Sequence, residues 1–427
     1  MFLEKIKYRY IVSVILLLCN LIVIGQNIDY NVKHLKLPEQ IGVVSARSFV
    51  EDKNGFLYLG LQNGLFIYDG HEVKEIENID ASGRKYNFTN IESLVLDKDG
   101  EILIICRQTT FIYNPETNVF RRFILNESIG VEYRVGYVTR NNEIVIGTNK
   151  GLRIYNKSTK TYESFIHDSY NKKSLSHNVV RDVYEDSMGN RWVGTYNQLD
   201  KFDRSTKSFT AFNLKPIDAK QEKNNLILKI GLLPDGTNNN LIVGTETGLS
   251  IFNTTDYSFT TYTNENTSGE ISNDVIKTVY PISKDEVWFG TDFGLNKFSL
   301  KDKKITNFFH EFGNENSISH DVVNCLFQDK QGNLWVGTNN GVDKIYIPNN
   351  NILFNQTGPN SKQRLGSIEV NSFSEDKQGN IWFATNQGLL KYDTKKDDYM
   401  EYHPPQILHT KVLNILIDKS DNVWIAT

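Results

Sequence analysis

The side chains that could carry acid–base or metal chemistry stand mainly at repeated positions in this sequence. Aspartate precedes glycine by three residues at Asp52/Gly55, Asp97/Gly100, Asp186/Gly189, Asp329/Gly332 and Asp376/Gly379. An aspartate at the start of a turn accepts backbone N–H groups, and a glycine later in the turn tolerates a positive φ. We therefore interpret these aspartates as turn residues and predict no catalytic residue among them.

The histidines and cysteines follow the same logic. His177 and His320 occupy one place in the matching strings "SLSHNVV" and "SISHDVV", and a third copy of this string has Asn273 there. Cys106 and Cys325 lie inside apolar strand patterns, which indicates buried thiols. The sequence has no Cys-x-x-Cys or His-x-x-His spacing. We therefore predict no metal site and no cofactor.

Three acidic residues stand outside the turn pattern, namely Glu132, Asp200 and Glu246. A glycosidase needs two carboxylates roughly 5 to 10 Å apart across a pocket, and the sequence does not bring any two of these together. A secreted enzyme that acts on glycans, as a lyase or a glycosidase, therefore stays an alternative. A protein-interaction scaffold is a second alternative.

A repeat positions all of these residues. Nine copies align on the glycine of "VGT", 42 to 50 residues apart, at Gly60, Ile105, Gly147, Gly194, Gly244, Gly290, Gly337, Ala384 and Ala426. This period is typical of a four-stranded propeller blade. Alternating patterns such as "DVVNCLFQD" favour strands over helices. The sequence thus predicts an all-β fold, a seven-bladed β-propeller of four-stranded blades followed by the start of a second propeller.

The tryptophans share one position of this repeat, which holds Tyr58, Leu103, Val145 and Ile242 in other copies. Aliphatic residues at the same position argue against stacking platforms for sugars and favour packing between blades. The tryptophans with this predicted structural role are Trp192, Trp288, Trp335, Trp382 and Trp424.

Ligand binding is expected at the variable loops. Strand direction alternates within a blade, so the loops between second and third strands share one face with the loops that enter each blade. These loops differ from copy to copy, and binding commonly uses variable loops on a rigid scaffold. Guanidinium and phenol groups suit acidic or hydroxyl-rich ligands. The predicted ligand-binding residues are Arg84, Tyr86, Arg107, Tyr133, Arg134, Lys150, Tyr196, Glu246 and Phe293.

Domain boundaries follow from ring closure. The segment "IDYNVKHLKL" resembles a lone outer strand that could complete the seventh blade, because propellers commonly close by joining the two termini. We predict a first propeller over residues 26–350 and the beginning of a second, truncated propeller over residues 351–427. The ninth copy supplies only two strands, so we expect the chain to be the N-terminal part of a longer product.

The first 25 residues predict export. Three cationic residues precede an apolar run of about 14 residues, which is shorter than the roughly 20 that span a bilayer as a helix. We interpret residues 1–25 as a signal peptide, with an uncleaved anchor as the alternative. The net charge of −4 argues against binding of nucleic acid.

The strings "DKQGNLWVGTNNGV", "DKQGNIWFATNQGLLKYD" and "DSMGNRWVGTYNQLDKFD" resemble the two-component regulator propeller repeat of periplasmic sensor regions in hybrid histidine kinases. The copies "EILIICRQTT" and "TRNNEIVIGT" depart from it. The resemblance implies a periplasmic sensor for glycan-derived oligosaccharides or another small ligand, and a homodimer in the full-length protein. It also implies a membrane helix and a kinase domain beyond this chain, which is therefore not expected to be an enzyme itself.

Overall fold

The computed structural model describes residues 30–347, with gaps at 39–41, 43, 81, 87, 124–129, 215–224 and 238, and residues 369–427, with gaps at 394–397, 403–410 and 419. The predicted signal peptide lies outside these residues. Every regular element in the described part of the chain is a β-strand, so this part contains no helix that could cross a membrane. The chain divides into two compact units, residues 1–347 and 348–427.

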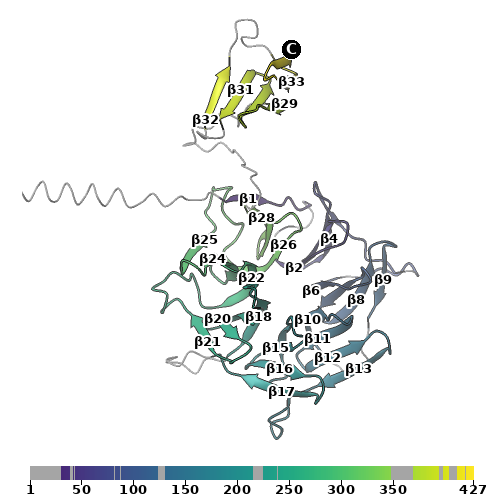
Figure 1. The fold of residues 1–427 in the computed structure, drawn as a ribbon. Helices are drawn as coiled ribbons and strands as arrows, with labels where there is room; N and C mark the ends of the chain where they lie inside the picture. The colour runs from purple at the N-terminus through teal and green to yellow at the C-terminus, as the bar shows by residue number, and fades with distance from the viewer. Residues whose placement is uncertain are drawn as a thin grey trace, which may run out of the picture. The chain divides into compact units, whose positions relative to one another are not determined.

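The first unit contains seven four-stranded antiparallel sheets, which Figure 1 shows arranged as blades around a common centre. Blade 1 comprises β2 (Ala46–Glu51), β3 (Leu57–Leu61), β4 (Gly64–Tyr68) and β5 (Val73–Glu75). Blade 2 comprises β6 (Ile91–Leu96), β7 (Ile102–Cys106), β8 (Thr109–Asn114) and β9 (Val119–Arg122). Blade 3 comprises β10 (Tyr133–Val138), β11 (Glu143–Thr148), β12 (Gly151–Asn156) and β13 (Thr161–Phe165).

The next three blades have the same strand order. Blade 4 comprises β14 (Val180–Glu185), β15 (Arg191–Thr195), β16 (Leu199–Asp203) and β17 (Ser208–Phe212). Blade 5 comprises β18 (Ile227–Leu232), β19 (Asn240–Thr245), β20 (Gly248–Asn253) and β21 (Phe259–Tyr262). Blade 6 comprises β22 (Ile276–Ser283), β23 (Glu286–Thr291), β24 (Leu295–Ser299) and β25 (Lys304–Phe308).

Blade 7 closes the ring. It comprises β26 (Val323–Gln328), β27 (Leu334–Thr338), β28 (Gly341–Tyr346) and, from the N-terminal segment, β1 (Asn31–His34). β1 pairs antiparallel with β28, from Asn31 opposite Tyr346 to His34 opposite Asp343. β26 contacts β2, so the innermost strands form a closed circle. The predicted propeller fold is confirmed, and the segment before the first repeat does supply the outer strand of the seventh blade.

The second unit contains a four-stranded sheet and a two-stranded sheet. The first is formed by β29 (Val370–Glu375), β30 (Ile381–Thr385), β31 (Gly388–Asp393) and β32 (Asp398–Tyr402), and the second by β33 (Asn414–Ile417) and β34 (Val423–Ala426). Trp382 packs against Val412 and Ile415, whereas the Trp424 side chain is 62% exposed.

The core of the propeller lies between neighbouring blades. Trp335 of β27 packs with Leu59 and Phe66 of blade 1, and Trp192 of β15 packs with Phe252 of blade 5. Trp288 of β23 is likewise fully buried. Burial of such large apolar surfaces between sheets is the main stabilising contribution to a fold of this kind.

The turn aspartates do more than shape the turn. Oδ1 of Asp329 accepts the backbone N–H of Asn333 at 2.8 Å, and its Oδ2 accepts the indole N–H of Trp335 at 2.9 Å. The same aspartate–indole bond joins Asp186 to Trp192 at 2.9 Å. The six-residue spacing of Asp and Trp in the repeat therefore satisfies a buried indole donor. Sequence reasoning assigned these aspartates to turns and missed this bond.

Candidate ligand-binding site

The innermost strand of each blade has a β-bulge at its second residue. In blade 1, Ala46 pairs with Leu61 and Ser48 with Gly60, so Arg47 has no partner on β3. A bulge of this kind redirects the extra side chain and often occurs next to functional sites. The extra residues of the seven innermost strands are Arg47, Glu92, Arg134, Arg181, Leu228, Lys277 and Asn324.

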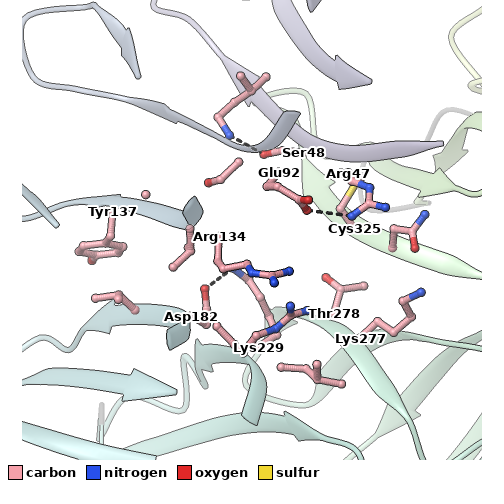
Figure 2. Close-up of a pocket in the computed structure, with 18 of the residues that line it drawn as sticks. Arg47, Ser48, Glu92, Arg134, Tyr137, Asp182, Lys229, Lys277, Thr278 and Cys325 are labelled. Atoms are coloured by element: carbon pink, nitrogen blue, oxygen red, sulfur yellow. Dashed lines mark hydrogen bonds and ion pairs between the residues drawn. The ribbon is translucent and has the colours of Figure 1, made fainter. Parts of the chain in front are cut away.

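All seven extra residues line one cavity of about 580 Å³ at the centre of the ring. Every innermost strand contributes to its wall, together with Asn339 from the turn between β27 and β28. In Figure 2, Arg47, Glu92, Arg134, Lys229 and Lys277 project from different strands toward this common space. A cavity of this volume is in the size range of small-molecule sites.

The charged side chains gather at one end of the cavity. All seven blades repeat one strand order, so the second residues of the innermost strands lie at the same end of the ring. Apolar and aromatic side chains join the wall further along these strands, including Tyr137 and Tyr184, whose ring centroids are 6.2 Å apart. Burial raises the pKa of Tyr184 to about 12, so its hydroxyl stays neutral at physiological pH.

Glu92 organises one side of the charged end. Its Oε2 accepts a hydrogen bond from Nη1 of Arg47 at 2.8 Å. Its Oε1 accepts two from Arg107, at 2.9 Å from Nε and 2.7 Å from Nη2. The Glu92 side chain is only 11% exposed, so the two arginines neutralise a carboxylate that is largely removed from water.

Asp182 has a corresponding role on the other side. Its Oδ1 lies 3.0 Å from Nζ of Lys229, and its Oδ2 accepts the backbone N–H of Ile230 at 2.7 Å. Both lining carboxylates are therefore held by protein donors. The cavity as a whole is lined by five cationic side chains and two acidic ones.

Two further cations pair with acidic residues of the surrounding loops. Nη2 of Arg134 lies 2.5 Å from Oε2 of Glu132, and Nζ of Lys277 lies 3.1 Å from Oδ1 of Asp292. Asp292 lies in the turn between β23 and β24. The charged end of the cavity thus opens among the loops that the sequence analysis assigned to ligand binding.

Two of the nine predicted residues lie at or beside the cavity wall. Arg134 lines the cavity and Arg107 reaches its edge through Glu92. Tyr133 is buried, with 7% of its surface exposed, among Ile105 and Ile144 of the core between blades 2 and 3. Its ring is therefore not presented to a ligand.

The remaining predicted residues lie further out. Tyr86 donates to Oδ2 of Asp80 at 2.9 Å and packs on Phe111 of β8, and the Arg84 guanidinium lies 5.3 Å from the Tyr86 ring centroid. The structure does not bring this loop to the cavity wall. The other four occupy turns between second and third strands and are Lys150, Tyr196, Glu246 and Phe293.

Sequence reasoning missed six charged residues of the cavity wall, namely Arg47, Glu92, Arg181, Asp182, Lys229 and Lys277. A signal was present, because a charged residue interrupts the apolar alternation at one repeat position, as in "SARSFVED" and "SHNVVRDVYED". Recognising it required knowledge of the bulge, which turns that position toward the ring centre.

Asp200 forms a buried hydrogen-bonded contact with Ser176, which links β16 to the segment before β14. It is fully buried on β16, and its Oδ2 accepts Oγ–H and N–H of Ser176 at 2.6 and 3.1 Å. Burial raises the pKa of Asp200 to about 7, although the Ser176 donors oppose this shift. Asn296 makes the equivalent contact with Ser272 in blade 6, so an amide serves equally well in this clamp.

Acidic residues also cluster in blade 2 at Asp97, which is buried, Asp99, which is exposed, and Glu101, with carboxylate oxygens within 4.8 Å of one another. Nζ of Lys157 lies 2.6 Å from both Asp97 and Asp99. The Lys157 ammonium group therefore partly neutralises the negative charge of this cluster.

Comparison with known proteins agrees with the fold. The two-component regulator propeller family model matches residues 317–340 and 364–387. No curated protein matches the chain. Extracellular domains of two hybrid two component systems from B. thetaiotaomicron are each 21% identical over 93% of this chain, with TM-scores of 0.62 and 0.63. This chain spans about half of each, 51% and 52%.

A propeller enzyme has a similar fold as well. Virginiamycin B lyase from Staphylococcus aureus matches 74% of this chain and 99% of its own length, at 10% identity and a TM-score of 0.54. At these identities each likeness concerns the fold alone.

Proposed function

We propose that this protein is the ligand-sensing region of a hybrid two-component sensor, located outside the inner membrane, because its chain matches the two-component regulator propeller repeat. Its ligand is a small molecule of the glycan-derived oligosaccharide class. The observation that supports this role is the cavity at the centre of the ring, where each of seven blades contributes one redirected side chain to a single wall. The solved sensor domains with a similar fold support it further.

A sensor of this kind uses binding energy to shift an equilibrium between two states. A ligand shifts such an equilibrium only by its difference in affinity for the two states, which in the full-length protein are two arrangements of a homodimer. Seven separate blades that contact one ligand provide a means for this difference, since a small change in their relative position alters all contacts at once. The role requires binding without turnover, in contrast to an enzyme.

The test is a binding screen on the exported protein by isothermal titration calorimetry, with a panel of oligosaccharides released from plant and host glycans. Each sample is then analysed by chromatography for new products. We expect at least one oligosaccharide to bind and to be recovered intact. Recovery of cleaved sugar would instead support a glycan-active enzyme, and absence of binding across the panel would contradict the proposed ligand class.

A further inference from the structure

Arg181 is the least satisfied charge in the cavity. It is the extra residue of the bulge in β14, and it lines the cavity as a partly buried side chain. It makes no hydrogen bond or ion pair with another residue in the described part of the chain. A guanidinium group has five N–H donors and stays charged, so it normally has acceptors when it leaves water.

Neighbouring cations add to the uncompensated positive charge at Arg181. Burial lowers the pKa of Arg181, and the nearby charges of Arg134, Arg107 and Arg47 lower it further against the opposite effect of Glu92. The Nε atoms of Arg47 and Arg134 are also buried without a hydrogen-bond partner. The charged end of the cavity therefore holds three guanidinium groups whose N–H donors are not all satisfied by the protein, and that of Arg181 has no protein acceptor in the described residues.

The acceptors of the cavity are already in use. Both oxygens of Glu92 accept hydrogen bonds from Arg47 and Arg107, and both oxygens of Asp182 accept hydrogen bonds from Lys229 and the Ile230 backbone. Neither carboxylate makes a hydrogen bond or ion pair with Arg181. Five cationic side chains against two carboxylates therefore favour a partner that brings its own negative charge and its own acceptor oxygens.

We propose that the charged end of the central cavity is a binding site for an anionic ligand, in which Arg181 receives a carboxylate or sulfate group in bidentate fashion and the guanidinium groups of Arg47 and Arg134 add positive charge. The biological use of this site rests on the proposed sensing role, and the site narrows the proposed ligand class from oligosaccharides to acidic saccharides. The paired geometry of guanidinium and a planar or tetrahedral oxyanion provides the specificity. Apolar and aromatic side chains beyond the bulges, such as Phe49, Leu94 and Tyr137, contact the body of the ligand.

The same arrangement predicts an effect on the unliganded protein. Like charges held in one cavity repel each other, and sites built for binding are commonly less stable than a neutral replacement. Arg181→Gln should therefore raise the Tm of the protein without ligand. A side chain with a merely structural role would lower it when replaced.

Binding is tested with two acidic probes and their neutral counterparts at constant ionic strength. The carboxylate probe is a galacturonic acid trisaccharide, compared with a galactose trisaccharide. The sulfate probe is N-acetylglucosamine 6-sulfate, compared with N-acetylglucosamine. Calorimetry is performed on the wild-type protein, on Arg181→Gln, and on Arg122→Gln, which removes the same charge from an exposed position on the outermost strand of blade 2.

We expect at least one acidic probe, and neither neutral sugar, to bind the wild type and Arg122→Gln. Arg181→Gln should weaken that binding by at least about tenfold, the effect of losing a charge-assisted hydrogen bond. Equal binding of the neutral sugars, unchanged affinity in Arg181→Gln, absence of binding by both acidic probes, or a lower Tm of unliganded Arg181→Gln would each overturn the proposal.

The anion site and the sensing role fail in different ways. Acidic sugar that binds through Arg181 but leaves kinase activity of the full-length protein unchanged supports the site and rejects sensing at it. Kinase activity that responds to a neutral sugar and persists in Arg181→Gln supports sensing and rejects the anion site.

Discussion

His34 and Asp343 join the two ends of the propeller, with Nδ1 of His34 2.7 Å from Oδ1 of Asp343 across 309 residues of sequence. Oγ of Ser319 lies 3.0 Å from the same ring nitrogen. In a Ser–His–Asp catalytic triad the serine and the aspartate contact opposite nitrogens of the ring. The shared nitrogen therefore indicates a structural clasp between β1 and β28, and no nucleophile.

This clasp should make ring closure depend on pH. The hydrogen bond from Asp343 raises the pKa of His34 above its ordinary value, against the opposing effect of burial. A raised folded-state pKa stabilises the fold below the unfolded value of about 6.5, and this contribution is lost as pH rises through the folded-state pKa. We expect His34→Ala to reduce the free energy of unfolding more at pH 5.5 than at pH 9, and hence to lower the Tm more at pH 5.5. The difference should be less than about 1 kcal/mol because the His34 side chain is 39% exposed.

The control for this measurement is His71→Ala, which removes an exposed imidazole. Thermal unfolding at both pH values should show no difference of this kind for His71→Ala. An effect of His34→Ala that is the same at both pH values would contradict the ionic clasp.

The sequence predicts the fold of this protein well because the fold is periodic. Gly55, Gly189 and Gly332 do have positive φ in their turns, as the Asp-to-Gly spacing requires. The segment before the first repeat does pair with the last blade, because an unpaired sheet edge is unfavourable. The turn prediction depends on local chemistry repeated in several blades, and the closure prediction on the need to pair the edge of the last blade.

The cavity was not predictable in the same way. Its wall takes one bulge residue from each blade, and these residues are 42 to 49 residues apart along the chain. Variation among those residues, from Arg47 to Glu92 to Leu228, resembles ordinary surface variation until the bulge places them together. Ile105 likewise stands where other copies of the repeat have glycine or alanine, and the sequence alone does not explain it. In the structure, Gly136 of the next blade provides the space for the Ile105 side chain.

The glycine at the repeat position should tolerate substitution unequally between blades. A Cβ on Gly244 would lie 2.7 Å from the backbone oxygen of Ile276, whereas a Cβ on Gly60 would meet the side chain of Ile91 at 2.8 Å. A side chain can change rotamer, but a backbone strand held in a sheet shifts at greater cost. We expect Gly244→Ala to destabilise the protein by about 1 to 3 kcal/mol in urea unfolding. Gly60→Ala is the matched control and should cost less; the reverse order would contradict this explanation.

The aspartate–indole bond should contribute measurably to stability. Asp329→Ala leaves the buried indole N–H of Trp335 and the Asn333 N–H without their acceptor. An unsatisfied buried donor costs about 1 to 3 kcal/mol, so we expect a loss of this size in urea unfolding followed by circular dichroism. Asp285→Ala, at an exposed turn position of blade 6, is the control and should change stability by less than about 0.5 kcal/mol. A loss no larger than that of the control would show that water replaces the acceptor.

The buried carboxyl of Asp200 should make blade 4 more stable in mild acid. Its pKa of about 7 in the folded protein exceeds the unfolded value of about 3.9, so the folded state binds the extra proton between these values. Stability from this group therefore falls as pH rises from about 4 to 7 and stays low above that range. Asp200→Asn should be more stable than the wild type at pH 8, by roughly 1 to 2 kcal/mol, and nearly equal to it at pH 5.

The reverse substitution in blade 6 tests the same cause. Asn296 is buried, accepts the Ser272 N–H at 3.1 Å and donates to its Oγ at 2.7 Å, as an amide should in this clamp. Asn296→Asp should introduce a loss of stability above neutral pH that the wild type lacks. Urea unfolding of both variants at pH 5 and pH 8 provides the comparison. A lower stability of Asp200→Asn at pH 8 would mean that Asp200 is held as a carboxylate, and burial would then not control its proton.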